Sequence, residues 1–316
     1  MISICMATYN GERFIREQMD SILRQTYQDF EVVICDDCSR DGTLSILQEY
    51  AQRDSRIHIY KNEHNLGLVK NFEKAIGLSK GEFVALCDQD DIWTDDHLQY
   101  LLDNIGDYDI ACGNAELINA DGTPKHMLLN VAESFYVKYE NELFLYRHLC
   151  IGNPLQGSSM LIKRSFLNSG KVFPIAEGIG FQDAYFSMCA TLMNGISYSF
   201  DKVVNYYRMH EHNASGSKKK LNVFRTLFKI ISRKIKREKY TTDRLDYIKA
   251  AREHFELTEN QKKIIDECEQ IITSRMSRNI IVKFKGAKLF YKRYKYVMAA
   301  KNNHLRLLAT IRTLLY

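Results

Sequence analysis

Three aspartates stand within four residues directly after an apolar run. Residues 83–87 are typical of a buried strand, and Asp88, Asp90 and Asp91 follow them. Carboxylates this close repel one another, so a folded protein needs a compensating charge beside them. A divalent ion is the simplest one, because Mg²⁺ and Mn²⁺ prefer oxygen ligands. The alternative is a solvated acidic turn that opens a helix.

Polar residues also follow two earlier strand-like runs. Residues 8–10 come after the run 2–6, and the pair Asp36 and Asp37 comes after the run 30–35. Helical spacing of apolar residues separates the strand-like runs, and this alternation occurs four times in the first 90 residues. It predicts a parallel sheet with helices on its faces, where ligands bind at the carboxyl ends of the strands. The polar groups should therefore face one crevice.

Such a crevice could hold a nucleotide. Tyr9 could stack on a base, Asp36 or Asp37 could accept hydrogen bonds from the base or ribose, and the later acids could hold metal and diphosphate. Each residue alone also has an ordinary structural interpretation, as a core aromatic or a helix cap. Their common position at strand ends favours the nucleotide site.

The composition is that of a globular protein. The chain has 316 residues, 45% hydrophobic and 26% charged, enough for one large α/β domain with an appendage. Its eight cysteines are scattered, which suits a reducing cytosol, and the Cys35 and Cys38 pair has no second pair for a zinc site. No apolar run is long enough to span a bilayer, and a strand-like run begins at Ile2, so we expect a cytoplasmic protein without a signal peptide.

The charge divides the chain in two. Residues 217–316 contain 26 Lys and Arg against 9 Asp and Glu, whereas residues 1–216 contain 18 against 30. In the basic part, residues 221–236 place an apolar stripe among Lys and Arg side chains. Such a helix can lie on an anionic membrane or pack on a neighbouring domain, and both interpretations stay open. No motif for nucleic-acid recognition is present.

The order and spacing of the motifs resemble inverting family 2 glycosyltransferases of the GT-A fold. The segments that carry the resemblance lie at residues 7–10, 18–25, 30–43, 65–67 and 80–83, and they lead into Asp88 and Asp90. The resemblance spans roughly residues 1–216. Later segments look like bacterial rhamnosyl- and galactosyltransferases of surface polysaccharide synthesis.

The resemblance implies a UDP- or dTDP-sugar donor bound in the first half of the chain. The residues that it assigns to nucleotide binding are Ala7, Thr8, Tyr9, Asp37, Asn65, Lys70 and Asp88. It makes Asp90 the principal ligand of Mn²⁺ or Mg²⁺, with Asp88 and His210 as further candidates. Lys70 stands where many members have an arginine, and a lysine lacks the planar fork for a bidentate contact.

The second half would supply the base. Transfer to a hydroxyl needs a group that removes its proton, and Asp183, at a predicted helix start, matches the aspartate of the family's catalytic pair. Gln182 replaces the acid or histidine that usually precedes it, and a plain helix N-cap is the alternative for Asp183. The residues implied beside the donor and acceptor sugars are Gly157, Ser158, Gln182 and Arg208, with Arg208 near the leaving group.

These inferences predict a two-part enzyme. Residues 1–216 form a GT-A catalytic domain, with a nucleotide-binding half at 1–115 and an acceptor half at 116–216, and residues 217–316 form a basic, mainly helical region. We expect inverting transfer to a lipid-linked or polysaccharide acceptor in O-antigen or capsule synthesis, with the protein peripheral on the inner face of the cell membrane. A scaffold that binds nucleotide sugars without catalysis is the alternative, favoured by Gln182. A dehydrogenase is disfavoured, since no G-x-G-x-x-G follows the first strand.

Overall fold

The computed structural model describes residues 1–129, 141–150, 152–153, 155–211, 213, 242–277 and 279–297. The chain forms two compact units. Unit 1 comprises residues 1–130, 154–176 and 180–210, and unit 2 comprises residues 131–153, 177–179 and 211–316. The predicted basic stripe at 221–236 lies outside the described residues.

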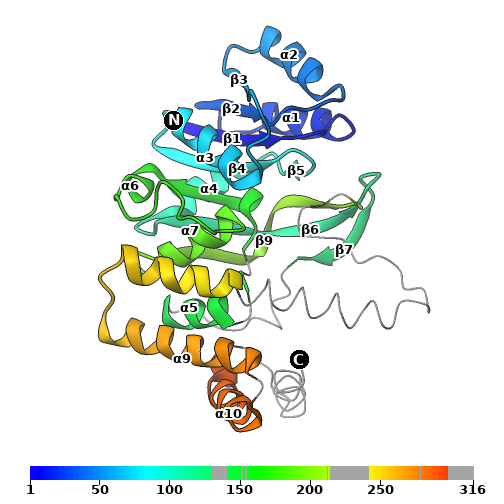
Figure 1. The fold of residues 1–316 in the computed structure, drawn as a ribbon. Helices are drawn as coiled ribbons and strands as arrows, with labels where there is room; N and C mark the ends of the chain where they lie inside the picture. The colour runs from blue at the N-terminus through cyan, green and yellow to red at the C-terminus, as the bar shows by residue number, and fades with distance from the viewer. Residues whose placement is uncertain are drawn as a thin grey trace, which may run out of the picture. The chain divides into compact units, whose positions relative to one another are not determined.

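The first half of unit 1 alternates strands and helices as the sequence predicts (Figure 1). Its elements are β1 (Ile2–Thr8), α1 (Ile15–Leu23), β2 (Phe30–Asp36), α2 (Thr43–Arg53), β3 (Ile57–Lys61), α3 (Leu68–Leu78) and β4 (Phe83–Asp88). The four strands pair in parallel in the order β3-β2-β1-β4. Every residue of β1 and β2 is buried, which explains why both strands are mostly apolar. Their polar residues are Ser3, Thr8, Glu31 and Asp36.

The second half of unit 1 extends the same sheet with antiparallel and parallel neighbours. Its elements are β5 (Ile92–Trp93), α4 (His97–Ile105), β6 (Ile110–Asn119), β7 (Pro124–Leu128), the 3₁₀ turn η2 (Gly157–Ser159), β8 (Met160–Lys163), α6 (Arg164–Leu167), α7 (Gln182–Thr191) and β9 (Ile196–Met209). β8 lies antiparallel between β4 and β6. β9 runs parallel to β6 and also pairs with β5, which brings its end to the acidic loop. The predicted α/β class, a largely parallel sheet flanked by helices, is confirmed.

The loops after β1 and β2 are tied together at one edge of the sheet. The backbone N–H of Asn10 donates to Ser39 Oγ (2.9 Å), the Asn10 side-chain oxygen accepts from the Arg40 N–H (2.9 Å), and the Gly11 N–H donates to Thr43 Oγ1 (2.7 Å). Asn10 has a φ of 50°, a conformation that asparagine tolerates better than most residues. The polar residues at these two strand ends therefore share one edge, as expected from a parallel sheet.

Unit 2 is helical in its described part. It contains α5 (Asn141–Cys150), a helix over residues 242–254, α9 (Glu259–Met276) and α10 (Ile280–Val297). α9 begins with a capping box, in which the Thr258 side chain and the Gln261 side chain each bond the other's backbone N–H. In the described part of the chain, no helix is both long and apolar enough to cross a membrane.

α5 lies in a different unit from the one that the predicted domain boundary at residue 216 implies. Residues 116–216 were predicted to lie together in the acceptor half, but α5 packs on α9 and α10 and belongs to unit 2. The Arg275 guanidinium donates to the Cys150 carbonyl (3.3 Å), and that of Arg244 donates to the His148 carbonyl (3.0 Å). These bonds satisfy carbonyls of the last turn of α5, which an α-helix leaves without intrahelical partners.

Candidate active site

Four aspartates meet at the carboxyl end of β4. Burial raises the pKa of Asp88 well above its usual range, and the charges of Asp91, Asp90 and Asp183 raise it further. Asp183 comes from the start of α7, almost a hundred residues further along the chain. The structure therefore brings Asp183, the predicted general base, to the aspartates that are predicted to bind the metal ion and the nucleotide.

Asp183 is held by backbone groups. The N–H of Ala184 donates to Asp183 Oδ1 at 2.7 Å, and the Gly157 N–H also bonds this side chain. Desolvation by the surrounding protein outweighs these bonds and raises the pKa of Asp183 to about 6. A Cβ on Gly157 would lie 3.2 Å from Asp183 Cβ, so a larger residue would crowd this carboxylate. The small residue predicted at 157 thus allows the close approach of Asp183.

Asp90 and His210 form a pair at the acidic loop. His210 Nε2 lies 2.7 Å from Asp90 Oδ2, and their side chains are 7% and 18% exposed. The His210 ring also packs on Phe14, with 4.7 Å between ring centroids. Two of the three predicted metal ligands are therefore adjacent, one from the β4–β5 loop and one from the end of β9.

The donor atoms of this pair suit a divalent cation. Within the described ranges, no group of three or more His, Cys, Asp or Glu side chains is arranged to hold a metal ion. Mg²⁺ in nucleotide enzymes commonly takes only one or two protein carboxylates and completes its shell with phosphate and water. The oxygen of Asp90 and the nitrogen of His210 fit that requirement, with Asp88 as an additional carboxylate nearby.

Asp91 is the buried centre of a hydrogen-bond network that the sequence analysis did not assign. Its Oδ2 accepts from Ser158 Oγ (2.6 Å), Asn205 Nδ2 (2.9 Å) and Gln156 Nε2 (3.2 Å). Its Oδ1 accepts from the Arg208 backbone N–H (3.1 Å). Burial and the neighbouring Asp90 raise the pKa of Asp91 to about 7, although these donors partly offset the rise. Ser158, predicted to lie beside the transferred sugar, uses its hydroxyl in this network.

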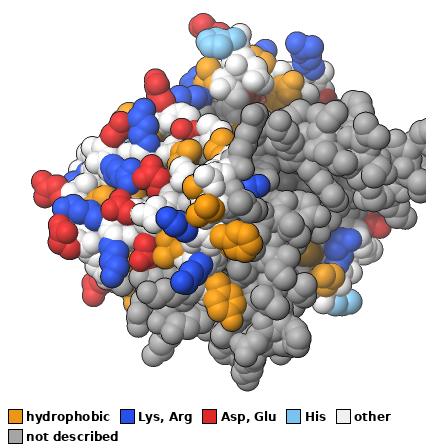
Figure 2. Space-filling model, turned by 60° about the horizontal axis from the view of Figure 1, so that its bottom comes forward, with side chains coloured by type: hydrophobic (Ala, Val, Ile, Leu, Met, Phe, Trp, Pro, Cys, Tyr) orange, Lys and Arg blue, Asp and Glu red, His pale blue; other side chains and the backbone are white. Residues whose placement is uncertain are grey.

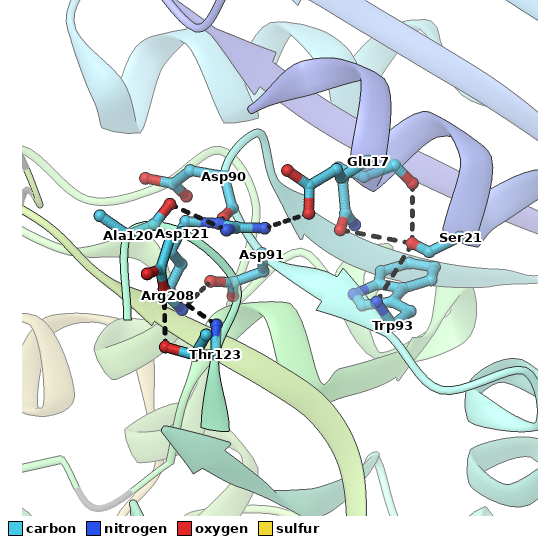
Figure 3. A network of polar contacts seen from close by, with 10 residues as sticks. Glu17, Ser21, Asp90, Asp91, Trp93, Ala120, Asp121, Thr123 and Arg208 are labelled. Carbon is cyan, nitrogen blue, oxygen red and sulfur yellow. Dashed lines mark hydrogen bonds and ion pairs between the residues drawn. The ribbon is translucent and has the colours of Figure 1, made fainter. Parts of the chain in front are cut away.

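Arg208 is fully buried beneath the acidic loop (Figure 3). Its guanidinium donates to the Asp90 carbonyl (2.8 Å), the Ala120 carbonyl (3.1 Å) and Glu17 Oε2 (2.9 Å). It lies 5.0 Å from the centroid of the Phe14 ring. Arg208 was predicted to lie near the leaving group, whereas these contacts fasten the β4–β5 loop to α1 and β9.

Asp37 is buried and bonded by its own surroundings. Its carboxylate accepts from Asn62 Nδ2 (2.8 Å) and from the backbone N–H groups of Leu66 (2.7 Å) and Gly67 (2.9 Å). Asn65 Nδ2 donates to the Asp37 backbone carbonyl (3.1 Å). Asp37 and the neighbouring Asn65 thus organise the segment that enters α3. This segment lies at the edge of the sheet where the nucleotide base is predicted to bind.

The other predicted nucleotide residues divide into exposed and buried groups. Tyr9 is 47% exposed, and its backbone N–H and carbonyl both bond the Gln89 amide (2.9 and 3.0 Å). Ala7 and Thr8 are buried, and Thr8 Oγ1 donates to Asp36 Oδ2 (3.1 Å). Lys70 lies on the exposed side of α3, where it pairs with Glu73 (3.0 Å). Tyr9 is therefore the member of this set with an exposed ring.

Three functional-site features were missed from the sequence. Asp91 was counted in the acidic cluster without a role, and Asn205 and Glu17 were given no role. A polar residue inside the short run 203–207, whose other members are valine and tyrosine, was the available signal for Asn205. Gln182 is 5% exposed, and its Oε1 has no hydrogen-bond partner among the described residues.

Known proteins share both the sequence pattern and the fold. Residues 3–168, just over half of the chain, match the family model "Glycosyl transferase family 2". The dTDP-rhamnosyl transferase RfbG of Shigella flexneri is 31% identical over 222 residues, covering 67% of this chain and 74% of RfbG. The Escherichia coli UDP-Glc:alpha-D-GlcNAc-diphosphoundecaprenol beta-1,3-glucosyltransferase WfgD is 36% identical over 121 residues, covering 38% of this chain and 47% of WfgD. The chain spans about half the length of several other curated relatives that it matches.

Solved structures extend the likeness to almost the whole chain. Staphylococcus aureus TarS 1–349 in complex with UDP-GlcNAc has a TM-score of 0.57 at 21% identity, covering 94% of this chain and 88% of that one. The mannosyltransferase PcManGT from Pyrobaculum calidifontis, in complex with GDP-Man and Mn²⁺, has a TM-score of 0.56 at 18% identity, covering 100% and 80%. The matched family model, the relative RfbG and these folds lead to one assignment: the chain belongs to glycosyltransferase family 2 and has the GT-A fold.

Proposed function

We propose that this protein transfers a hexosyl or rhamnosyl group from a UDP- or dTDP-sugar to a hydroxyl of a lipid-linked or polysaccharide acceptor, with inversion at the anomeric carbon. The names of RfbG and WfgD, a dTDP-rhamnosyl transferase and an enzyme with a diphosphoundecaprenol acceptor, support these donor and acceptor classes. The UDP-GlcNAc complex of TarS supports a nucleotide-sugar donor. The product would enter a cell-surface polysaccharide such as O-antigen or capsule.

The proposed mechanism is a single displacement. The acceptor oxygen attacks the anomeric carbon as its proton passes to a carboxylate oxygen of Asp183, and the bond from that carbon to the diphosphate oxygen breaks. The electron pair of the broken bond leaves with the nucleoside diphosphate. A pKa of about 6 keeps Asp183 ionised at neutral pH while making it a stronger base than an ordinary aspartate.

The remaining residues would hold the donor. Asp90 and His210, with Asp88, would bind Mn²⁺ or Mg²⁺, which offsets negative charge on the diphosphate when bound. Tyr9 would stack on the base, and Asp37 and Asn65 would shape the loop that receives it. Arg208 and Asp91 would fix the metal-binding loop and the 157–158 segment from beneath. Gly157 would leave space beside Asp183 for the sugar.

The observation that carries this proposal is the convergence of Asp183 with Asp88, since separate elements bring a raised-pKa carboxylate to the metal-binding acids. The test is Asp183→Asn, assayed for nucleoside diphosphate release and sugar transfer with a panel of UDP- and dTDP-sugars and Mn²⁺. Loss of a general base typically lowers turnover 10²–10⁴-fold. We expect a loss of about that size, with donor binding retained in a thermal-shift assay.

One control variant and two possible outcomes make this test decisive. Asp107→Asn changes an exposed aspartate outside the site and should leave turnover unchanged. If Asp183→Asn transfers sugar at the wild-type rate, Asp183 is not the base. If the wild-type protein binds donors but releases no nucleoside diphosphate with any of them, the non-catalytic scaffold replaces the enzyme.

A further inference from the structure

The outward side of α10 carries large apolar side chains. Ile281, Phe284 and Tyr291 are 63%, 58% and 46% exposed. Spacings of three and seven residues place these three on one side of an α-helix. A soluble helix normally turns such residues inward, so this side of α10 is unusual for a surface in contact only with water.

The inward side of α10 is already occupied. Ala287 and Phe290 are buried, and the Arg275 guanidinium of α9 lies 5.5 Å from the Phe290 ring centroid. A Cβ on Gly286 would collide with the Ser274 side chain, so α9 and α10 approach closely there. α10 therefore has two apolar sides, and among the described residues of unit 2 packing accounts for only one of them.

Positive charge surrounds the exposed apolar side. Lys285 and Lys288 are exposed among these side chains, and α10 as a whole has six Lys and Arg and no Asp or Glu. No acidic residue occurs in the chain after Glu269. The solvent side of α9 differs, since Lys262 there pairs with Glu259 at 2.7 Å. Figure 2 shows hydrophobic and Lys or Arg side chains adjoining one another on the face that it views.

An anionic lipid bilayer fits both properties of this side. Apolar side chains enter the boundary between headgroups and acyl chains, and lysines neutralise the lipid phosphates. A second copy of α10 would bring positive charge against positive charge, which opposes association. A nucleic acid would engage the lysines but would leave Ile281 and Phe284 in water.

We propose that the outward side of α10, formed by Ile281, Phe284, Lys285, Lys288 and Tyr291, binds the surface of an anionic phospholipid bilayer. The inference rests on the proposed function only in that a lipid-linked acceptor requires contact with a membrane. α10 would lie parallel to the bilayer plane, with its Gly286 and Phe290 side kept against α9.

The test measures binding of the purified full chain to vesicles of equal parts phosphatidylglycerol and phosphatidylcholine, and to vesicles of phosphatidylcholine alone. One variant, Lys285→Gln/Lys288→Gln, removes charge, and a second, Ile281→Ser/Phe284→Ser, removes apolar surface. The matched control, Lys262→Gln/Lys263→Gln, removes two exposed lysines from α9. Thermal unfolding of each variant establishes that its fold is retained.

We expect wild-type protein to bind the anionic vesicles more tightly than the neutral ones. Each basic residue near an anionic surface strengthens binding about fivefold, so the charge variant should bind about 25-fold more weakly. The apolar variant should lose at least about tenfold, and the control should lose much less than the charge variant. Raising the salt concentration should weaken wild-type binding and narrow the difference between the variants.

Three results would overturn the inference. They are equal binding to both vesicle types, equal losses in the α9 control and the α10 charge variant, and self-association or nucleic-acid binding that accounts for all the effects of the α10 variants. Donor hydrolysis in solution, measured on the same proteins, separates this inference from the proposed function. Normal hydrolysis without vesicle binding rejects only the membrane face, and vesicle binding without hydrolysis rejects only the enzyme.

Discussion

Asp37 and Asp183, two aspartates predicted to belong to one site, have contrasting surroundings. The Asp37 carboxylate accepts bonds from Asn62, Leu66 and Gly67, so both of its oxygens have partners in the chain. The bonds that hold Asp183 come from backbone N–H groups, and desolvation still raises its pKa to about 6. One carboxylate therefore stabilises a loop, while the other is destabilised as an ion and suited to accept a proton.

After the loss expected for Asp183→Asn, the largest expected effect is the pH dependence of turnover. A base with a pKa of about 6 must be ionised to act, so turnover should fall about tenfold for each pH unit below 6. At pH 4 the loss should reach about a hundredfold relative to the plateau above pH 7. Turnover under saturating donor, measured with the folded fraction monitored by circular dichroism, checks this. A profile that stays flat down to pH 4.5 in folded protein would contradict the role of Asp183.

The network at Asp91 gives the next effect. Asp91→Asn places an amide N–H₂ or a single carbonyl where several donors converge, and buried unpaired donors cost about 1–3 kcal/mol each. We expect lower stability and weaker donor binding in Mn²⁺, since the 157–158 segment and β9 lose their common anchor. The double variant Asp91→Asn/Asn205→Asp restores a carboxylate–amide pair and should recover most of the lost stability and most of the lost donor binding. Equal defects in the single and double variants would show that pairing is not what this site requires.

Substitutions of Asp37 and of Asp183 should also differ in their effects on the stability of the protein. Asp37→Asn turns an amide N–H₂ toward the Gly67 or Leu66 N–H and should lower the free energy of unfolding by about 1–3 kcal/mol. Asp183→Asn should keep or raise it at pH 8. The reason is the sign of the shift: a carboxyl whose folded pKa is raised above its unfolded value costs stability when ionised. Urea unfolding of both variants at pH 8 makes the comparison, and a greater loss for Asp183→Asn would reverse it.

Much of this fold could be predicted because local patterns determine it. Continuous apolar runs and helical stripes located β1 through β4 and α1 through α3, and a parallel sheet required the strand ends to share an edge. The insertion of β8 between β4 and β6 pairs segments far apart in the sequence, and no local pattern determines such a pairing. No local pattern in residues 141–150 indicates that α5 packs with α9.

The sequence predicted which residues belong to the candidate site better than it predicted the directions of their side chains. The acidic cluster and Asp183 are brought together, but sequence alone did not indicate that Asp91 turns inward toward Ser158. Arg208 was expected at the leaving group because it is positively charged, yet the register of β9 directs it beneath the loop toward Glu17. Strand register is a property of the whole sheet, so a short motif predicts which residues are present and leaves their direction open.

Lys70 should show the smallest effect. It was placed in the nucleotide site because it occupies the position of a family arginine, but its ammonium pairs with Glu73 on the exposed side of α3. Exposed pairs of this kind contribute about 0.2–1 kcal/mol. Lys70→Ala should therefore lower the free energy of unfolding by less than about 1 kcal/mol and change the donor KM by less than about fivefold. Isothermal titration with UDP- and dTDP-sugars in Mn²⁺ measures the binding part, with Lys74→Ala as a neighbouring comparison, since Lys74 bonds Asn62 at 2.8 Å beside Asp37. A loss of donor affinity much larger for Lys70→Ala than for Lys74→Ala would mean that Lys70 leaves Glu73 when the nucleotide binds. In that case Lys70, which is exposed and does not bond Asp37, would contribute more to donor recognition than the segment 62–67 that bonds the Asp37 carboxylate.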